Sequence, residues 1–297
     1  MSSKSIVEQF GVDKISDSEY KSKSPLILPF PKARGVYGGN LVGQALLVAI
    51  KSCPNTSFKP HSLHSYFITA CNNKDLVTYK IENLSNGRSF INKQIRALQN
   101  DTLVYIANVS LTNKFKKGFK FESVQQSKEK IKDIPISTVD SHLNIYYKFP
   151  KKFVKLDETK YEEDQKVTER KLSFYSKFGK DRDITNDEEG CLKYLAITNL
   201  ADSGYLTSLT RLLRIEDFPI NNHRYLYFLV SMDHTMYFHD DDFDINEWIN
   251  IQFHSVNFNH DRIVFEGELF NEKGTHIATY VQEGLIKLNQ LEEKAKL

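Results

Sequence analysis

The sequence predicts an α+β fold in which one unit, a set of antiparallel strands wrapped around an apolar helix, occurs twice. Three observations predict it. The second half of the chain repeats the strand pattern of the first, and an apolar helical segment precedes each copy. A stretch rich in Lys and Glu, 115–170, separates the two copies. Internal repetition of this kind indicates duplicated supersecondary units.

The repeat is visible when His64 is aligned with His234, so that "HSYF" matches "HTMYF" with one residue inserted. Three further pairs of segments then match in order: 76–87 with 248–259, 88–101 with 262–274, and 102–113 with 275–286. Apolar and polar residues alternate in these segments, and "QND" and "NEKG" provide short hairpin loops. Each copy is therefore predicted to hold four strands, paired mostly antiparallel.

A helix is expected before each set of strands. Residues 38–53 are apolar nearly all round, which is typical of a buried helix, and Pro54 cannot continue it. The second helix is expected through 191–214, after a strand at 172–178. One stripe of this helix holds, at three- and four-residue spacing, Leu192, Leu195, Asn199, Asp202, Leu206, Leu209 and Leu213.

A long antiparallel sheet curled around one apolar helix is the hot-dog arrangement, and two copies with joined sheets form a double hot dog. We expect an N-terminal hot dog at 1–114 and a C-terminal one at 171–290. The charged stretch 115–170 is expected as a solvated linker across the outer face, and 291–297 as a tail.

Composition excludes several classes of protein. The 297 residues carry a net charge of +2, and this mild basicity does not predict a nucleic-acid partner, which usually requires a clustered basic face, whereas an anionic small ligand is compatible. The three cysteines, Cys53, Cys71 and Cys191, form no CxxC pair and are expected to be reduced thiols. Neither a secretory signal nor an apolar run long enough to span a membrane is found.

The last three residues, Ala295, Lys296 and Leu297, are similar to the S-K-L address that peroxisomal import recognises. A small residue, a base and a leucine occupy its three places. The sequence therefore predicts the peroxisomal matrix as location and the import receptor as a partner.

Common catalytic motifs are absent from the sequence. It contains no GxSxG elbow, no HExxH motif and no GxGxxG or Walker loop, so neither a metal nor another cofactor is expected. Asp202 is informative because a carboxylate on an apolar stripe is costly unless it is hydrogen-bonded or in a wet pocket. Gln282 lies in the last strand, and the repeat matches it with Asn108, also an amide.

The stretch "SMDHTMYFH" adds further polar groups. Alternation places Ser231 and Asp233 on one face of the strand, and Met232 and His234 on the other. His234 fits a satisfied core histidine, and Asp233 fits a structural role as well as a functional one. Asp202 could deprotonate a water that Ser231 and Gln282 position. Such an apparatus suits a thioester, whose thiolate leaves readily.

Five motifs in order, "RGVYGGNLVGQALLVA", "HSLHSYF", "NGRSF", "SMDHTMYFH" and "VQEG", resemble the type II acyl-CoA thioesterases, the bacterial and peroxisomal double-hot-dog enzymes. The resemblance covers 34–114 and 172–287. It implies that Asp202, Ser231 and Gln282 hold the hydrolytic water, and that fatty acyl-CoA is cleaved to free fatty acid and CoA. The candidate substrate-binding residues are Gly38, Gly39, Gln44, His64, Asp233 and His234.

Two departures from that family concern the substrate range. Asn40 follows the two glycines where the family more often has glutamine, and "ITACNN" replaces a Gly-Asp pair after "HSYF". Serine at 231 keeps the hydroxyl of the commoner threonine. The competing hypotheses are a non-catalytic acyl-CoA binder and a hot-dog dehydratase, which would need a histidine near the central helix. A homodimer or larger assembly is expected, because sheet edges are usually covered.

Overall fold

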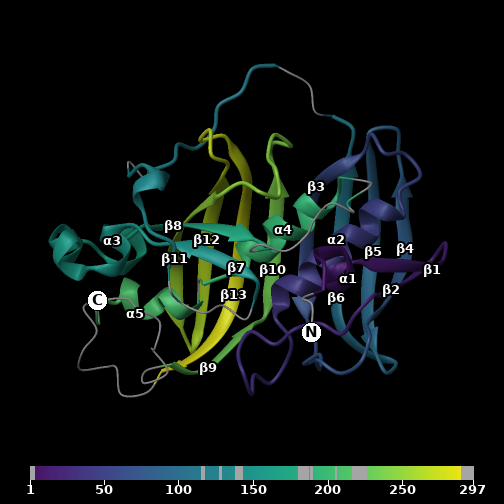
Figure 1. Cartoon of the computed structure of the whole chain (residues 1–297), viewed down its shortest axis with the longest axis horizontal. Coiled ribbons are helices and arrows are strands. Elements are labelled where there is room, and N and C mark those ends of the chain that lie inside the picture. Colours follow the sequence, from purple (N-terminus) through teal and green to yellow (C-terminus); the bar gives the residue numbers. More distant parts are fainter. Residues whose placement is uncertain are drawn as a thin grey trace.

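The computed structural model describes residues 4–114, 118–126, 129–137, 143–179, 187, 190–204, 206–215 and 226–288. All of the strands described here belong to one 13-stranded antiparallel sheet (Figure 1). Its order is β1-β2-β4-β5-β6-β3-β10-β13-β12-β11-β8-β7, and β9 pairs with β13 beside this path. The sheet thus contains two consecutive sets of strands that meet at β3 and β10.

The first half follows the predicted order of elements. Its hairpin between β5 and β6 turns at Asn100 and Asp101, which have φ values of 49° and 61°. Asn and Asp tolerate this left-handed conformation better than most residues. The elements are α1 (Ile6–Phe10), β1 (Val12–Ser16), β2 (Glu19–Ser22), α2 (Gly38–Lys51), β3 (Lys59–Phe67), β4 (Thr78–Asn86), β5 (Phe90–Gln99) and β6 (Thr102–Thr112).

The second half repeats this pattern with additions before its helix. The helices are α3 (Lys151–Val154), α4 (Leu192–Ala201) and α5 (Leu209–Leu212). The strands are β7 (Ile145–Lys148), β8 (Leu172–Phe178), β9 (Leu226–Ser231), β10 (Asp233–Phe238), β11 (Ile249–Asn259), β12 (Arg262–Phe270) and β13 (His276–Leu288). Short 3-10 turns lie at Ile131–Asp133, Leu156–Asp164, Val167–Glu169 and Leu206–Ser208.

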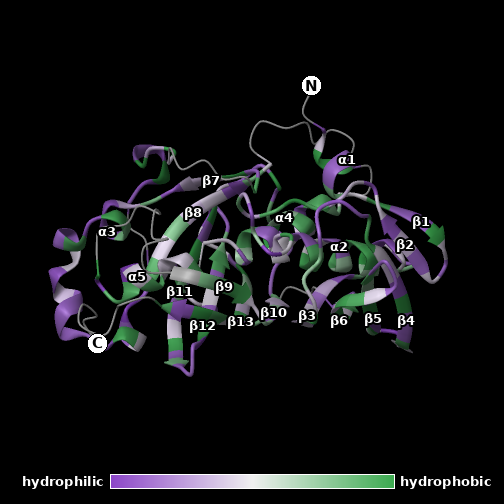
Figure 2. Ribbon diagram, turned by 90° about the horizontal axis from the view of Figure 1, so that it is seen from below, coloured by the Kyte–Doolittle hydropathy of each residue, from purple (hydrophilic) through white to green (hydrophobic). Residues whose placement is uncertain are grey.

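The two halves join through β3 and β10, which pair antiparallel with Ser65 opposite His234 and His64 opposite Thr235. Figure 2 shows the joined sheet as a floor beneath α2 and α4, with β1–β2 and β7–β8 rising at its two ends. The predicted double hot dog is therefore confirmed. The repeat alignment, however, paired two histidines that lie on opposite faces, since His64 is exposed and His234 is buried.

The two central helices pack directly against each other. A Cβ atom on Gly43 of α2 would lie 2.9 Å from Asn199 Nδ2 and 3.0 Å from Thr198 Oγ1 of α4. Only glycine permits this approach, because overpacking a filled interface forces neighbouring groups to shift. Most of α2 is buried, from Gly39 to Ala49, as its all-round apolar character predicts.

The second helix is shorter than the sequence predicts. Instead of one helix through 191–214, α4 ends at Ala201 and α5 begins at Leu209. The chain breaks at Gly204, whose φ of +76° is a left-handed conformation that ends helices. Asp202 is the C-cap residue of α4 rather than part of a continuous stripe, so its side chain lies at a helix end.

Alternation in the 231–236 stretch is also interrupted. Ser231 pairs with Gly284, whereas Thr235 pairs with Val281, so this strand holds one residue more than β13 opposite it. A bulge of this kind re-aims side chains. The expectation that Ser231 and His234 face opposite sides is therefore wrong. Both lie on the side of the sheet that carries α4.

The charged stretch 115–170 is not solvated throughout, contrary to expectation. Its last part contributes β7, which pairs with β8, and several helical turns. Glu162 is buried and bonded to two buried arginines, Arg211 at 2.7 Å and Arg214 at 2.9 Å. Arg170 is buried too and donates to the carbonyl oxygens of Glu162 and Leu212. These contacts attach the segment before β8 to α5.

Two expectations about the environment of the chain can be compared with the structure. All three cysteines are free thiols. Within the described ranges, every helix is too short or too polar to cross a membrane. The tail 291–297, including the targeting tripeptide, lies outside the described residues.

Candidate active site

Asp202 lies where the C-terminal end of α4 meets the N-terminal end of α2. The N–H group of Gly39, in the first turn of α2, donates to Asp202 Oδ2 at 2.7 Å. The N–H groups of a first turn have no carbonyl partner within the helix, and they attract anions. A Cβ atom on Gly38 would lie 3.0 Å from Asp202 Oδ2 and 2.9 Å from the Phe67 ring, so the approach of the two helix ends requires glycine there.

The other carboxylate oxygen of Asp202 receives two donors from neighbouring strands. Gln282 Nε2, from β13, donates to Oδ1 at 2.5 Å. Ser231 Oγ, from the end of β9, donates to the same oxygen at 3.2 Å. The structure thus brings together the acid, the hydroxyl and the amide that the sequence singled out, and the bulge after Ser231 makes this possible.

The environment of Asp202 favours a base that works near neutral pH. Burial raises the pKa of Asp202 to about 6, against the donors Gln282, Gly39 and Ser231, which favour the ionised form. No positively charged side chain is among the groups that shift it. At neutral pH most of the carboxyl groups are ionised, and their affinity for a proton is higher than that of an exposed aspartate.

Gln282 is bonded on its other side to His234. The imidazole Nδ1 lies 2.7 Å from Gln282 Oε1, and the ring stacks on Tyr280 at 6.1 Å with an interplanar angle of 14°. Burial lowers the pKa of His234 to about 4, so the ring is neutral at pH 7. Two buried tyrosines near Asp202, Tyr105 from β6 and Tyr280, have pKa values raised by burial and are neutral as well.

Two family models match most of the chain. The acyl-CoA thioesterase N-terminal domain matches residues 27–112, and the acyl-CoA thioesterase C-terminal domain matches residues 149–286. The chain belongs to the type II acyl-CoA thioesterase family. The family consists of thioester hydrolases, so this chain is an enzyme of that class.

Individual relatives of this thioesterase are distant but cover nearly its full length. It is 25% identical to the peroxisomal acyl-coenzyme A thioester hydrolase 1 of Saccharomyces cerevisiae, over 86% of each chain. It is 24% identical to the acyl-CoA thioesterase 2 of Haemophilus influenzae, over 96% of this chain and 98% of the relative. The acyl-CoA thioesterase II structure from Mycobacterium marinum superposes with a TM-score of 0.71 at 17% identity, covering 95% and 96% of the two chains.

Three predicted substrate-binding residues of the thioesterase lie apart from the Asp202 cluster. Gln44, although buried, is bonded to Phe10 O at 2.9 Å and to the Tyr79 hydroxyl at 2.7 Å. His64 is exposed on the outer face and lies edge-on to Tyr237.

The third of these residues, Asp233, is half-buried beyond the bulge and accepts a hydrogen bond from the Glu283 N–H at 2.7 Å. Burial raises the pKa of Asp233. Gly38, Gly39 and His234 remain close to Asp202, the last through Gln282.

Sequence reasoning missed how the first helix anchors this site in the thioesterase. The Tyr37 hydroxyl, just before α2, donates to Asn199 O in the last turn of α4 at 2.5 Å. A Cβ atom on Gly39 would lie 3.0 Å from Asn199 Cα. The adjacent glycines at the start of an otherwise apolar helix were the available signal, because such pairs permit close backbone approach.

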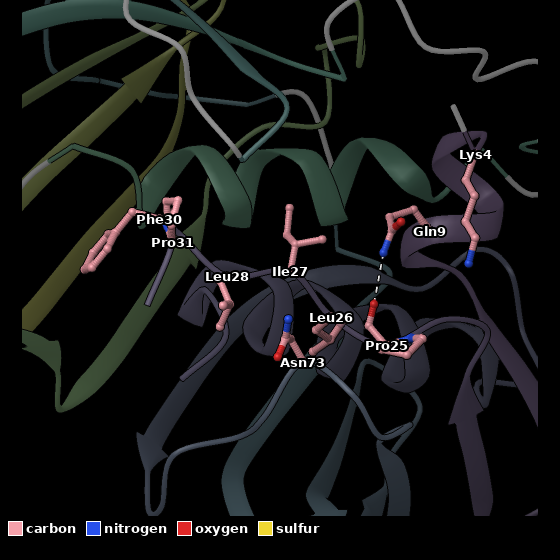
Figure 3. Close-up of a pocket in the computed structure, with 9 residues that line it drawn as sticks. All are labelled: Lys4, Gln9, Pro25, Leu26, Ile27, Leu28, Phe30, Pro31 and Asn73. Atoms are coloured by element: carbon pink, nitrogen blue, oxygen red, sulfur yellow. Dashed lines mark hydrogen bonds between the residues drawn. The ribbon is translucent and has the colours of Figure 1, made fainter. Parts of the chain in front are cut away.

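A pocket of about 410 Å³ lies elsewhere in the first half (Figure 3). Apolar residues of the 25–31 segment line one side, and Lys4, Gln9 and Asn73 contribute polar groups. Gln9 donates to Pro25 O at 3.0 Å, which attaches α1 to that segment. None of the residues in the Asp202 cluster lines this pocket, so the pocket and the cluster are separate features of the molecule.

Proposed function

We propose that this thioesterase hydrolyses fatty acyl-CoA thioesters to the free fatty acid and CoA, with Asp202 as general base. The observation that supports this most directly is the buried carboxylate with its raised pKa, bonded to a hydroxyl, an amide and a helix N–H group. A thioester requires little more, because its carbonyl is weakly stabilised by resonance and thiolate is a good leaving group.

In the proposed reaction a water molecule binds beside Asp202, Ser231 and Gln282. Asp202 takes one proton from this water while the water oxygen bonds to the thioester carbonyl carbon. The tetrahedral intermediate then loses the CoA thiolate as the carbon–sulfur bond breaks. The proton held by Asp202 passes to the thiolate or to solvent, which restores the ionised carboxylate. Ser231 and Gln282 act by fixing the position of the water.

The start of α2 is the proposed site for the negative charge that develops on the carbonyl oxygen. Gly39 N–H already donates to Asp202, so Gly38 N–H, one residue earlier, is the candidate donor to this oxyanion. The positive end of the α2 dipole adds to this stabilisation. The Phe67 ring packs closely against Gly38 at this helix end.

Thiol release from acyl-CoA substrates of increasing chain length tests the proposal. Asp202→Asn is expected to lower kcat by about 10³-fold while the protein stays folded, because the substitution removes the base and little volume. Asp242→Asn, which changes an exposed carboxylate paired with Lys273, is the matched control and should leave turnover unchanged. Full turnover by Asp202→Asn would remove Asp202 from the mechanism. Acyl-CoA binding without thiol release by the unaltered protein would favour the non-catalytic alternative.

We further propose that the enzyme acts in the peroxisomal matrix and binds the import receptor through Ala295, Lys296 and Leu297. The name of the yeast relative supports this location. An N-terminally labelled full chain should co-localise with a peroxisomal marker, and Leu297→Arg should leave it in the cytosol. Peroxisomal import of the Leu297→Arg protein would contradict the role of the tripeptide.

We also propose that two or more copies of the chain associate. The outer face at the β3–β10 junction exposes aromatic side chains, with Tyr66 at 61% and Tyr237 at 41% exposure. Exposed apolar patches of this kind favour protein contacts. Light scattering should give at least twice the mass of one chain, and Tyr66→Glu should shift the equilibrium towards single chains. A single-chain mass at all concentrations would refute it.

A further inference from the structure

His234 holds a fixed position behind Gln282 without contacting Asp202. It is fully buried in β10, and its ring stacks on Tyr280 from β13. The backbone carbonyl of His234 accepts a hydrogen bond from Ser65 Oγ of the first half at 2.7 Å. The backbone and the ring are thus both held, and the one hydrogen bond that the ring makes within the described part of the chain joins Nδ1 to Gln282 Oε1.

Asp202, Gln282 and His234 are joined by consecutive hydrogen bonds, and their donors and acceptors allow only one arrangement when Asp202 is ionised. A carboxylate only accepts, so Gln282 must turn its NH₂ group towards Asp202. The Gln282 carbonyl oxygen then faces the imidazole and also only accepts, so Nδ1 must carry a proton. Because burial lowers the pKa of His234 to about 4, the ring has one proton at neutral pH, and Nε2 carries none.

We propose that His234 is a positioning residue of the hydrolytic site, which through its Nδ1–H group fixes the Gln282 amide in the orientation that donates to Asp202. The inference rests on the proposed role of Asp202 as base. His234 itself touches neither the water nor the substrate. Its contribution is that the amide cannot turn over, because a turned amide would place two acceptors against each other at Asp202 and two donors against each other at His234.

Loss of the imidazole should therefore be visible at Asp202. Without the Nδ1–H group, the amide of Gln282 can rotate by half a turn and place its oxygen against the carboxylate. That rotation removes a donor which holds the pKa of Asp202 down. The other titratable groups near Asp202, Tyr105 from β6 and Tyr280 from β13, are neutral below pH 9. From the start of α2, the Gly39 N–H group also holds this pKa down. Loss of the imidazole leaves that group in place, so a change in the pKa of Asp202 reports on the amide.

The test compares His234→Leu with His234→Asn in the pH profile of kcat/KM. Leucine removes the donor, and we expect kcat/KM at pH 7 to fall by about tenfold to a hundredfold. The acid limb should also move up by about one pH unit. Asparagine places an N–H donor near the Nδ1 position. This variant should keep kcat/KM within a few-fold of the unaltered enzyme and leave the acid limb at its pH. His276→Leu, at a second buried histidine bonded to Ala278 O, is the control and should not move the limb.

Several outcomes would overturn the inference. An unshifted acid limb in His234→Leu, or an equal loss in the Leu and Asn variants, would indicate a role in packing alone. If His234→Leu does not fold, nitrogen NMR of the unaltered protein labelled at histidine decides, because the proposal requires the Nδ1–H tautomer. An Nε2–H tautomer would refute it. Asp202→Asn, measured in parallel, separates the two proposals. Full activity of Asp202→Asn would refute the role of Asp202 as base. Loss of activity in Asp202→Asn together with an unchanged pH profile in His234→Leu would refute only the positioning role of His234.

Discussion

The two halves of the molecule share a fold but differ at the ends of their central helices. The C-terminal end of α4 carries Asp202, whereas α2 contains no acidic residue and ends beside the buried Lys93, whose Nζ donates to Ser52 O at 3.1 Å. A cation at a helix C-terminus is favoured by the helix dipole and an acid is not. The first half therefore follows the stabilising rule, and the second departs from it at the residue proposed to carry the chemistry.

The strands show the same difference. β13 turns Gln282 inward towards Asp202, but the inward-facing residues of β6 carry no amide: they are Tyr105, Ala107, Val109 and Leu111. Asn108, which the repeat matches with Gln282, is exposed and bonded to Gln94 at 3.2 Å. We infer one hydrolytic site per chain. On this inference the first half contributes the N–H groups at the start of α2 to the site around Asp202 and forms no hydrolytic site of its own.

The largest expected effect comes from the buried ion cluster of the second half, which has no counterpart among the described residues of the first half. Glu162→Gln should lower the free energy of unfolding by about 3–5 kcal/mol, because Arg211 and Arg214 would stay buried without their carboxylate. Urea denaturation measures this change. Glu163→Gln, which changes a half-exposed partner of Arg214, should cost less than about 1 kcal/mol. An equal decrease in the free energy of unfolding for the two variants would mean that the buried carboxylate of Glu162 contributes no more stability than the half-exposed one of Glu163.

The next effect separates the two amides that the repeat matched. Gln282→Ala should lower kcat by about 10²-fold, because the substitution removes a donor to Asp202 that we propose also positions the water. Asn108→Ala should change kcat by less than about twofold, since its side chain lies on the outer face. Steady-state thiol release measures both. A large loss in Asn108→Ala would point to a second site in the first half.

A smaller effect is expected where the two halves touch through their helices. Gly43→Ala should cost about 1–3 kcal/mol of stability, because the new methyl group would meet Asn199 and Thr198 of α4. Thermal unfolding measures it, with Gly118→Ala as control, since among the described residues no atom beyond its own chain neighbours lies within 4 Å of the added Cβ there. Matching melting temperatures for the two variants would mean that the helices can separate without cost.

The smallest effect is the pH dependence of the unaltered enzyme. Asp202 works as a base only when ionised, and its pKa is raised by burial to about 6. We expect kcat/KM to be flat above about pH 7 and to fall about tenfold per unit below pH 6. A limb near pH 4, the range of an exposed aspartate, would mean that a group outside this buried cluster is titrating.

Much of the fold could be predicted from the sequence because strand alternation and apolar helices are local signals. Asp202 and its two side-chain partners, Ser231 and Gln282, were predicted from their types and approximate places. The backbone features that bring these groups together were not predicted. Gly204 ends α4 early, and an extra residue near Met232 turns Ser231 inward. Both depend on one residue within a regular pattern. The partners of Gln44 and Glu162 were equally hidden, because they lie far away in the sequence.

The pairing of β3 with β10 has a consequence for how such an enzyme can change. In an assembly of two identical subunits, each substitution appears twice, and every gain at one site is copied to its mirror image. Linking both units in one polypeptide removes that constraint. Lys93 and Asp202 can then occupy corresponding regions of the two units, one serving cohesion and the other reactivity, with neither residue required to do both.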